Sequence, residues 1–212
     1  MLELGAGTGR VTAALAGAGY EVVGVELSEA MLQGAERRLA NAELSGLVTL
    51  AQGDMRDIDL GRHFALVLAP FNALMHLYTL SDQDRALANI LRHLERSGAF
   101  ACDLFNPEFG RVDTLRREAE WGHVGGEAAE LFLYQQHNPD AQTIRSSYYL
   151  DRTTSDGTLR REKTTLLQRY YHRFEFERLL QHAGFGRVQL YGDFDKRPYR
   201  RSEPHLIAVA NL

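Results

Sequence analysis

The sequence has few of the residues on which disulfide, metal-thiolate and Schiff-base chemistry depend. Its 212 residues include one cysteine, Cys102, and two lysines, Lys163 and Lys196. A single cysteine excludes a disulfide framework and a zinc site built from several thiolates, and two lysines leave few amines for a Schiff base. The eight histidines show no H-x-x-x-H spacing, so we expect no metal site.

Long apolar runs and a basic excess are also missing. The run FALVLAPF at residues 64–71 is far shorter than the roughly 18–20 residues that cross a bilayer, and the first residues lack the basic start of a secretory signal. The formal net charge of −4 does not suggest a surface that selects nucleic acid. We therefore expect a cytoplasmic protein without nucleic-acid or membrane partners.

The first half of the chain alternates short apolar segments with helical patterns. Apolar, β-branched segments predict strands at residues 1–4, 21–26, 48–52, 64–69 and 98–105. Between them, Ser28 is a predicted helix N-cap, and Ser81 with Asp84 resembles a capping box before a helix that Gly98 stops. In the first predicted helix, one apolar face is expected to consist of Val11, Ala14, Leu15 and Ala18. This alternation is typical of an α/β fold with a parallel sheet and helices on both faces.

After residue 105 the pattern changes. Residues 130–171 contain three strand-like segments separated by turn residues at 138–140 and 155–157, which predicts a small antiparallel β insertion after the fifth strand. A helical pattern ending at Gly184 and strands near 186–192 and 205–210 then resume the α/β pattern. We therefore divide the chain into a core of residues 1–111, an insertion of residues 112–171, and a return to the core at residues 172–212.

The most informative motif is ELGAGTG at residues 3–9, where a predicted strand runs into a glycine-rich turn and then a helix. Glycines let a ligand approach the backbone closely, and the helix N-terminus offers free N–H groups. The G-x-G-x-G spacing differs from the G-x-G-x-x-G of dinucleotide-binding proteins. The nearby carboxylate of Glu3 suits a ligand with an ammonium or sulfonium charge better than a pyrophosphate.

Acidic residues follow the next two predicted strands. Glu26 ends the second strand, where a carboxylate can accept both hydroxyl groups of a ribose, and Asp54 and Met55 follow the third strand. Because the carboxyl ends of parallel strands meet at one edge of a sheet, we expect these residues and the glycine loop to form one ligand site.

These segments together resemble the class I S-adenosylmethionine-dependent methyltransferases. ELGAGTG is similar to the family's first motif, GVELSEAML to its ribose-binding segment, GDMRD to its adenine-contacting motif and FALVLAPFNAL to its fourth motif, while RFEFERLLQHAGF looks like its last helix. The resemblance covers residues 1–105 and 172–192, and it implies a Rossmann-like, seven-stranded, mostly parallel sheet whose last strand is antiparallel. The insertion is similar to those of small-molecule members such as amino-sugar N-methyltransferases and glycine N-methyltransferase.

The resemblance also implies S-adenosylmethionine as the cofactor and gives single residues their roles. The loop glycines would line the methionine moiety, Glu3 would meet its amino group and Glu26 would hold the ribose. Asp54 and Met55 would contact the adenine, and Pro70 would lie near the methyl group. The cofactor-binding set that it implies is Glu3, Gly5, Ala6, Gly7, Gly9, Glu26, Leu27, Asp54, Met55 and Pro70.

His76 is the candidate catalytic residue. It follows Pro70 on the segment expected to border the acceptor, where it could take a proton from an amine or a hydroxyl, or else pack as an ordinary helix residue. The family usually has helices before the first strand that cover the cofactor, whereas this sequence begins at the strand. We therefore expect a misassigned or truncated start, or a cover supplied by residues 112–170 or by a second subunit.

We therefore predict an enzyme that transfers a methyl group from S-adenosylmethionine to a nitrogen or oxygen of a small molecule. The alternative is a non-catalytic protein that binds S-adenosylmethionine or S-adenosylhomocysteine and acts through partners. A nicotinamide-dependent reductase is disfavoured by the glycine spacing and by the lack of a Tyr-x-x-x-Lys pair. The sequence does not identify the acceptor, and the exposed edge of the inserted sheet is compatible with a homodimer.

Overall fold

The structure is a computed structural model that describes residues 1–109, 112–124 and 127–212. The chain divides into two compact units, of which the first comprises Met1–Asn106 with Tyr171–Leu212 and the second Pro107–Tyr170. The boundary predicted at residue 111 lies outside the described residues. In the described part of the chain, none of the helices has the length and apolar character needed to cross a membrane.

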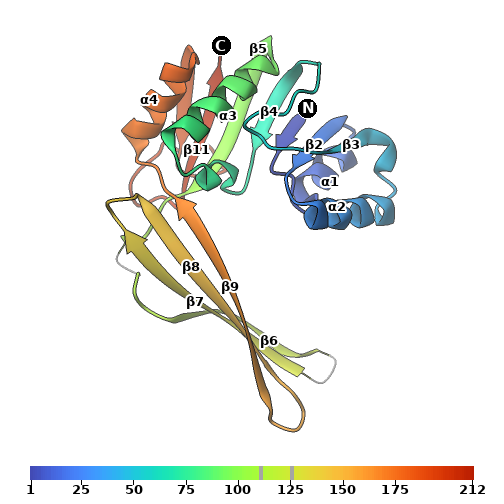
Figure 1. The fold of residues 1–212 in the computed structure, drawn as a ribbon, viewed down its shortest axis with the longest axis vertical. Coiled ribbons are helices and arrows are strands. Elements are labelled where there is room, and N and C mark those ends of the chain that lie inside the picture. Colours follow the sequence, from blue (N-terminus) through green and yellow to red (C-terminus); the bar gives the residue numbers. More distant parts are fainter. Residues whose placement is uncertain (110–111, 125–126) are drawn as a thin grey trace. The chain divides into compact units, whose positions relative to one another are not determined.

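The first unit is built on a seven-stranded sheet with the strand order β10-β11-β5-β4-β1-β2-β3 (Figure 1). Its strands are β1 (Leu2–Leu4), β2 (Val22–Glu26), β3 (Val48–Gln52), β4 (Phe64–Ala69), β5 (Leu94–Phe105), β10 (Arg187–Tyr191) and β11 (His205–Asn211). Strands β1 to β5 pair in parallel, whereas β11 runs antiparallel between β5 and β10. The predicted Rossmann-like, mostly parallel sheet with an antiparallel last strand is confirmed.

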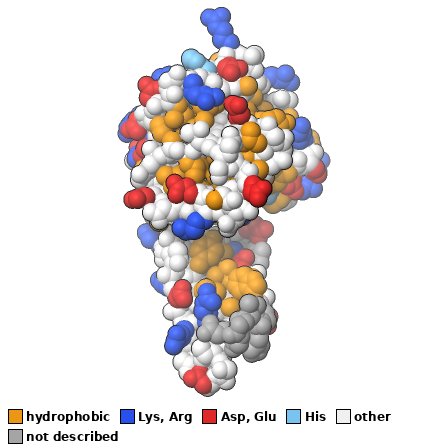
Figure 2. Space-filling view, turned by 90° about the vertical axis from the view of Figure 1, so that its right-hand side faces the viewer, with side chains coloured by type: hydrophobic (Ala, Val, Ile, Leu, Met, Phe, Trp, Pro, Cys, Tyr) orange, Lys and Arg blue, Asp and Glu red, His pale blue; other side chains and the backbone are white. Residues whose placement is uncertain are grey.

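Four α-helices and two short 3-10 helices complete the first unit. They are α1 (Arg10–Gly17), α2 (Glu29–Asn41), η1 (Ser45–Leu47), η2 (Ala73–His76), α3 (Leu80–Arg92) and α4 (Arg173–Ala183). Helices α1 and α2 contact β2 and β3, while α3 contacts β5 and α4 contacts β10. The core includes stacked rings of Phe100 and Phe185, whose centroids lie 5.6 Å apart, and Figure 2 shows apolar side chains interspersed with charged ones on the visible face of this unit.

The helix ends agree with the sequence patterns only in part. The N-cap predicted at Ser28 is confirmed, since its hydroxyl accepts a hydrogen bond from the N–H of Met31 at 3.4 Å. The predicted cap of α3 is wrong, because the hydroxyl of Thr79 accepts the N–H of Asp82 at 3.1 Å and starts the helix two residues earlier than Ser81 would. The predicted stop is also wrong: α3 ends at Arg92, and Gly98 lies inside β5.

The buried face of α1 also differs from the prediction. The fully buried residues of this helix are Thr12 and Ala16, whereas Ala14 and Ala18 are exposed. Alanine occupies so much of this short helix that several faces are nearly equally apolar, so the apolar pattern alone does not select the buried one.

The second unit is a four-stranded antiparallel sheet in the order β6-β7-β8-β9. Its strands are β6 (Arg116–Val124), β7 (Glu127–Asn138), β8 (Thr143–Thr153) and β9 (Leu159–Arg169). The antiparallel insertion after the fifth strand is confirmed, but β6 was not predicted, because charged residues from Arg116 to Glu120 hide the alternation that marks a strand. Homodimerisation through this sheet stays a prediction.

Candidate functional site

A cavity of about 550 Å³ opens where β1 to β4 end, entirely within the first unit. Its volume falls in the range of small-molecule sites. The predicted site residues that line it are Gly5, Glu26, Leu27, Asp54, Met55, Pro70 and His76. The structure therefore brings the three predicted motifs and the candidate catalytic histidine to one cavity, whereas Glu3, Ala6, Gly7 and Gly9 are not part of its described lining.

The glycine loop folds tightly over the end of β2. The N–H groups of Gly5 and Ala6 both donate to the carbonyl oxygen of Val25, at 2.8 and 2.9 Å. Gly5 has φ +76°, and a Cβ there would lie 3.1 Å from Cβ of Ala73. Gly9 has φ +74°, and a Cβ there would lie 3.0 Å from Cβ of Ala35 on α2. A side chain at either position would therefore combine backbone strain with a steric clash.

The carboxylate of Glu26 is held in place by backbone N–H groups. Oε2 accepts a hydrogen bond from Gly7 at 2.9 Å, and Oε1 accepts one from Ser28 at 3.0 Å. Each carboxylate oxygen can accept a further hydrogen bond. The side chain is thus fixed on the cavity wall with acceptor positions available for a ligand with two hydroxyl groups.

Glu3 lies behind the glycine loop in the interior of the first unit. Its side chain is buried, with 1% of the residue surface exposed, and Oε2 accepts a hydrogen bond from the hydroxyl of Thr12 at 2.5 Å. Burial raises the pKa of Glu3 to about 7, although the hydrogen bond from Thr12 opposes the shift. A direct contact between Glu3 and a ligand therefore stays a prediction.

The buried carboxyl group of Glu3 predicts that stability decreases as the pH rises. A carboxyl group with a raised pKa in the folded state contributes stability below its unfolded pKa and loses it as the pH rises through the folded pKa of about 7. We expect Glu3→Gln, which keeps the acceptor for Thr12, to stabilise the protein at about pH 8 by on the order of 2–3 kcal/mol and to change little at about pH 4.

Denaturant unfolding of both proteins at the two pH values measures this difference. Glu36→Gln on α2 is the control, because Glu36 is exposed. An equal effect of Glu3→Gln at both pH values would contradict a buried, titrating carboxyl group.

Asp54 is bound by Arg56, which the sequence patterns did not single out. Nε and Nη2 of Arg56 donate to the two carboxylate oxygens, and Nη1 of the same guanidinium donates to Oδ1 of Asp82 at 2.6 Å. Arg56 and Asp82 both line the cavity. The arginine between two aspartates in GDMRD could have indicated the contact of Arg56 with Asp54. No local pattern indicated the contact of Arg56 with Asp82, because Asp82 is distant in the sequence.

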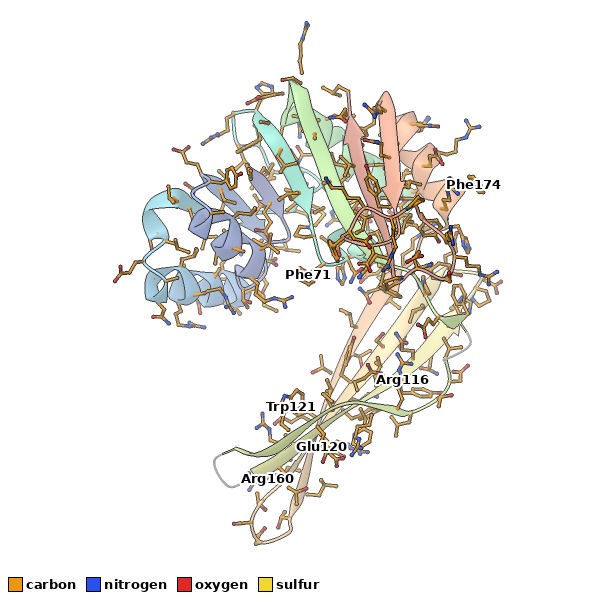
Figure 3. The ribbon with its side chains drawn as sticks, turned by 180° about the vertical axis from the view of Figure 1, so that it is seen from behind. Phe71, Arg116, Glu120, Trp121, Arg160 and Phe174 are labelled. Atoms are coloured by element: carbon orange, nitrogen blue, oxygen red, sulfur yellow. The ribbon has the colours of Figure 1, made fainter. Side chains whose placement is uncertain are left out.

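The segment after β4 adopts an unusual backbone conformation. Phe71 and Asn72 have φ +52° and +65°, a region that costs non-glycine residues about 1–3 kcal/mol each. The pair is held by β5, since Oδ1 of Asp103 accepts the N–H of Phe71 at 2.9 Å and Oδ1 of Asn72 accepts the N–H of Phe105 at 2.6 Å. Phe71 lines the cavity and is 56% exposed (Figure 3), and the guanidinium carbon of Arg10 lies 4.2 Å from its ring centroid.

His76 lies at the end of η2, on the same wall of the cavity as Leu77 and Tyr78. Although His76 is exposed by surface area, partial desolvation at the cavity wall lowers its pKa from the ordinary value, and the charge of Glu26 offsets part of that change. The imidazole is therefore neutral at neutral pH, which is the form that can accept a proton.

Comparison with known proteins gives these residues a context. A family model described as a methyltransferase domain matches residues 1–98. The chain is 38% identical over 124 residues to dTDP-3-amino-3,4,6-trideoxy-alpha-D-glucopyranose N,N-dimethyltransferase of Streptomyces venezuelae, which covers 56% of this chain and 50% of that protein. It is 30% identical over 131 residues to the cypemycin N-terminal methyltransferase of a Streptomyces species, which covers 62% of this chain and 47% of that protein. The chain thus spans about half the length of these two relatives.

A solved structure resembles the chain over nearly its whole length. The CcbJ methyltransferase from Streptomyces caelestis matches it with a TM-score of 0.80 and 28% identity, covering 99% of this chain and 82% of that one. The likeness includes both units, because the match extends through residues 107–170 as well as the seven-stranded sheet.

Proposed function

We propose that this chain, a member of the class I S-adenosylmethionine-dependent methyltransferase family, transfers a methyl group from S-adenosylmethionine to an amine nitrogen of a small molecule. The observation that carries the proposal is the cavity itself, in which Gly5, Glu26 and Asp54 meet at the ends of three adjacent strands. These are the positions at which the resemblance requires a close backbone, a ribose acceptor and an adenine acceptor.

The charges on the cavity wall fit a cationic cofactor. Glu26, Asp54 and Asp82 supply carboxylates, whereas the lining arginine, Arg56, is paired with both aspartates. A carboxylate-lined wall stabilises a nearby positive charge such as a sulfonium. When bound, S-adenosylmethionine supplies a methyl group already activated for transfer by its positive sulfur.

The protein's task in this reaction is alignment, exclusion of water and removal of one proton. Glu26 would hold the ribose, and the turn at Asp54 the adenine. The exposed ring of Phe71 would border the acceptor, because it stands beside Pro70 at the cavity wall. Holding two reactants in line can lower a barrier by several kcal/mol, so no further chemistry is required of the site except at the acceptor nitrogen.

The choice of nitrogen rests on the relatives and on His76. By their names, one of the relatives above is an N,N-dimethyltransferase of an amino sugar nucleotide and the other is an N-terminal methyltransferase of cypemycin. A protonated amine has no lone pair, so it must lose a proton before it attacks a methyl group. The neutral imidazole of His76 on the cavity wall is suited to accept that proton.

His76→Ala is expected to slow turnover by about 10²–10³-fold while changing cofactor affinity by less than about threefold. The parent rate should fall as the pH is lowered through the depressed pKa of His76, below 6.5, because the imidazole then gains a proton and stops acting as a base. In His76→Ala this acidic limb should disappear. Initial rates across pH with saturating cofactor measure the slower turnover and the loss of the acidic limb. The exposed His182→Ala on α4 is the control. An unchanged pH profile in His76→Ala would remove the residue from the reaction.

The function itself is tested by incubating the full chain with S-adenosylmethionine and a panel of amino sugar nucleotides, amine-terminated peptides and their hydroxyl analogues. The proposal expects a product that is one methyl group heavier on an amine. Methylation of hydroxyl analogues alone would overturn the choice of nitrogen. Cofactor binding without any product would favour the non-catalytic alternative.

A further inference from the structure

One side of α3 binds the turn that follows β3. Asp82, Arg85 and Asn89 lie three and four positions apart, so they share one face of the helix. Asp82 accepts from Arg56 at 2.6 Å, Nη2 of Arg85 donates to Asp57 at 2.7 Å, and Nδ2 of the buried Asn89 donates to the carbonyl oxygen of Met55 at 3.0 Å. The turn at residues 54–57 is therefore fixed by a neighbouring helix as well as by its own strand.

Within this turn, Arg56 determines how the carboxylate of Asp54 is oriented. The backbone N–H and Nε of Arg56 donate to Oδ1, each at 2.9 Å, while Nη2 and Nε donate to Oδ2 at 2.5 and 3.0 Å. This fork-to-fork geometry fixes the plane of the carboxylate. A carboxylate has about four acceptor positions. Three N–H groups of Arg56 occupy most of them, with the Nε–H shared between both oxygens, so about one position remains and its direction is fixed.

Arg56 is in turn held from its other side. Its Nη1 donates to Oδ1 of Asp82, and Oδ2 of Asp82 accepts the hydroxyl of Thr79 at 2.8 Å. The same hydroxyl accepts the N–H of Asp82 at the start of α3. A continuous series of hydrogen bonds therefore runs from the N-cap of α3 through Asp82 and Arg56 to Asp54.

We infer that Arg56 is a positioning residue that gives the cavity its preference for a 6-amino purine over a 6-oxo purine, by holding the Asp54 carboxylate with one acceptor position directed at the base. The inference rests on the proposed function, because it takes the base of the cofactor as the group that Asp54 meets. An ionised carboxylate accepts hydrogen bonds and donates none. It therefore pairs with an amino group and repels a carbonyl oxygen at the same place.

The charge state of Asp54 agrees with this role. The hydrogen bonds from Arg56 hold the pKa of Asp54 below its ordinary value, so the carboxylate stays ionised throughout the neutral range. Lysine at position 56 would keep the positive charge but could not form the two parallel hydrogen bonds that fix the plane. The substitution Arg56→Lys therefore separates the orientation of Asp54 from its charge.

The test compares calorimetric Kd values of the 212-residue chain for S-adenosylhomocysteine and S-inosylhomocysteine. The parent chain should prefer the adenosyl compound by at least about tenfold. Arg56→Lys should reduce this preference to about threefold or less, mainly by weakening adenosyl binding, and Asp82→Asn should reduce it in part. Arg197→Lys is the matched control, since Arg197 also binds several carboxylates but lies between β10 and β11.

Each outcome decides something. An unchanged preference in both Arg56→Lys and Asp82→Asn would overturn the inference while leaving the proposed function intact. Equal weakening of both ligands would also overturn it, because Arg56 would then only stabilise the turn. Failure of the parent chain to bind either ligand would overturn the proposed function, and the inference with it. If Arg56→Lys melts at a much lower temperature than the parent, the ligand preference of Asp82→Asn decides whether the inference stands.

Discussion

Gly5→Val is expected to abolish cofactor binding, with the Kd for S-adenosylhomocysteine rising by more than about 100-fold. The backbone of Gly5 has φ +76°, which a β-branched residue adopts only at a high cost. The new Cβ would lie 3.1 Å from Cβ of Ala73 and 3.8 Å from Cε of Met55, and both of these residues line the cavity. Valine would therefore push against the two sides of the site that the base and the methionine moiety are proposed to occupy.

The matched control for this change is Gly19→Val. Gly19 has φ +88°, but a Cβ there would have no heavy atom within 4 Å. Gly19→Val therefore reports the cost of placing valine at a positive φ, without an effect on the cavity. Calorimetric titration and thermal melting of both variants separate the two effects. Binding by Gly5→Val within about threefold of the parent value would show that the cavity beside the glycine loop is not the cofactor site.

Glu26→Ala is expected to have the second largest effect, weakening S-adenosylhomocysteine binding by about 100-fold. The substitution removes the proposed ribose acceptor and also leaves the N–H groups of Gly7 and Ser28 without the carboxylate that they now contact. Glu26→Gln should lose about tenfold, because its amide oxygen keeps one acceptor while its NH₂ group faces N–H donors. The effect should therefore be graded from glutamate to glutamine to alanine.

Glu29→Ala provides the control for that series. Glu29 is an exposed acid at the start of α2, close in sequence but not among the cavity residues. Its removal should leave the Kd unchanged, since it changes only the net charge near the site. Equal affinities for Glu26→Ala and Glu29→Ala would exclude Glu26 from ribose binding.

The parts of the site that the sequence predicted are those in which short segments determine the geometry. Gly5 follows β1, Glu26 ends β2 and Asp54 comes two residues after β3, and the topology of a parallel sheet brings these positions to one edge. Apolar strand segments and alternating helices were sufficient to predict this topology, because burial on both faces leaves a strong pattern.

The parts that the sequence did not predict depend on side-chain contacts over long separations. Arg56 meets Asp82 across 26 positions, and Phe71 meets Asp103 across 32. No local pattern records such pairs, because they depend on how the loops pack after the sheet has formed. The predicted N-cap of α3 was wrong for a local reason. Thr79 and Ser81 are both good capping residues, and the helix begins after the earlier one.

The residues that line the cavity all fall between Gly5 and Asp82 in the sequence. Later residues of the first unit, such as Asp103 beside Phe71, support these walls from behind and supply none of the lining that the structure describes. Divergence during evolution can therefore act on the two regions separately. Substitutions in the later part of the first unit that keep contacts such as Asp103 to Phe71 and Asn89 to Met55 leave the cavity lining unchanged. Homologous proteins can therefore differ widely in that part while they share this one surface.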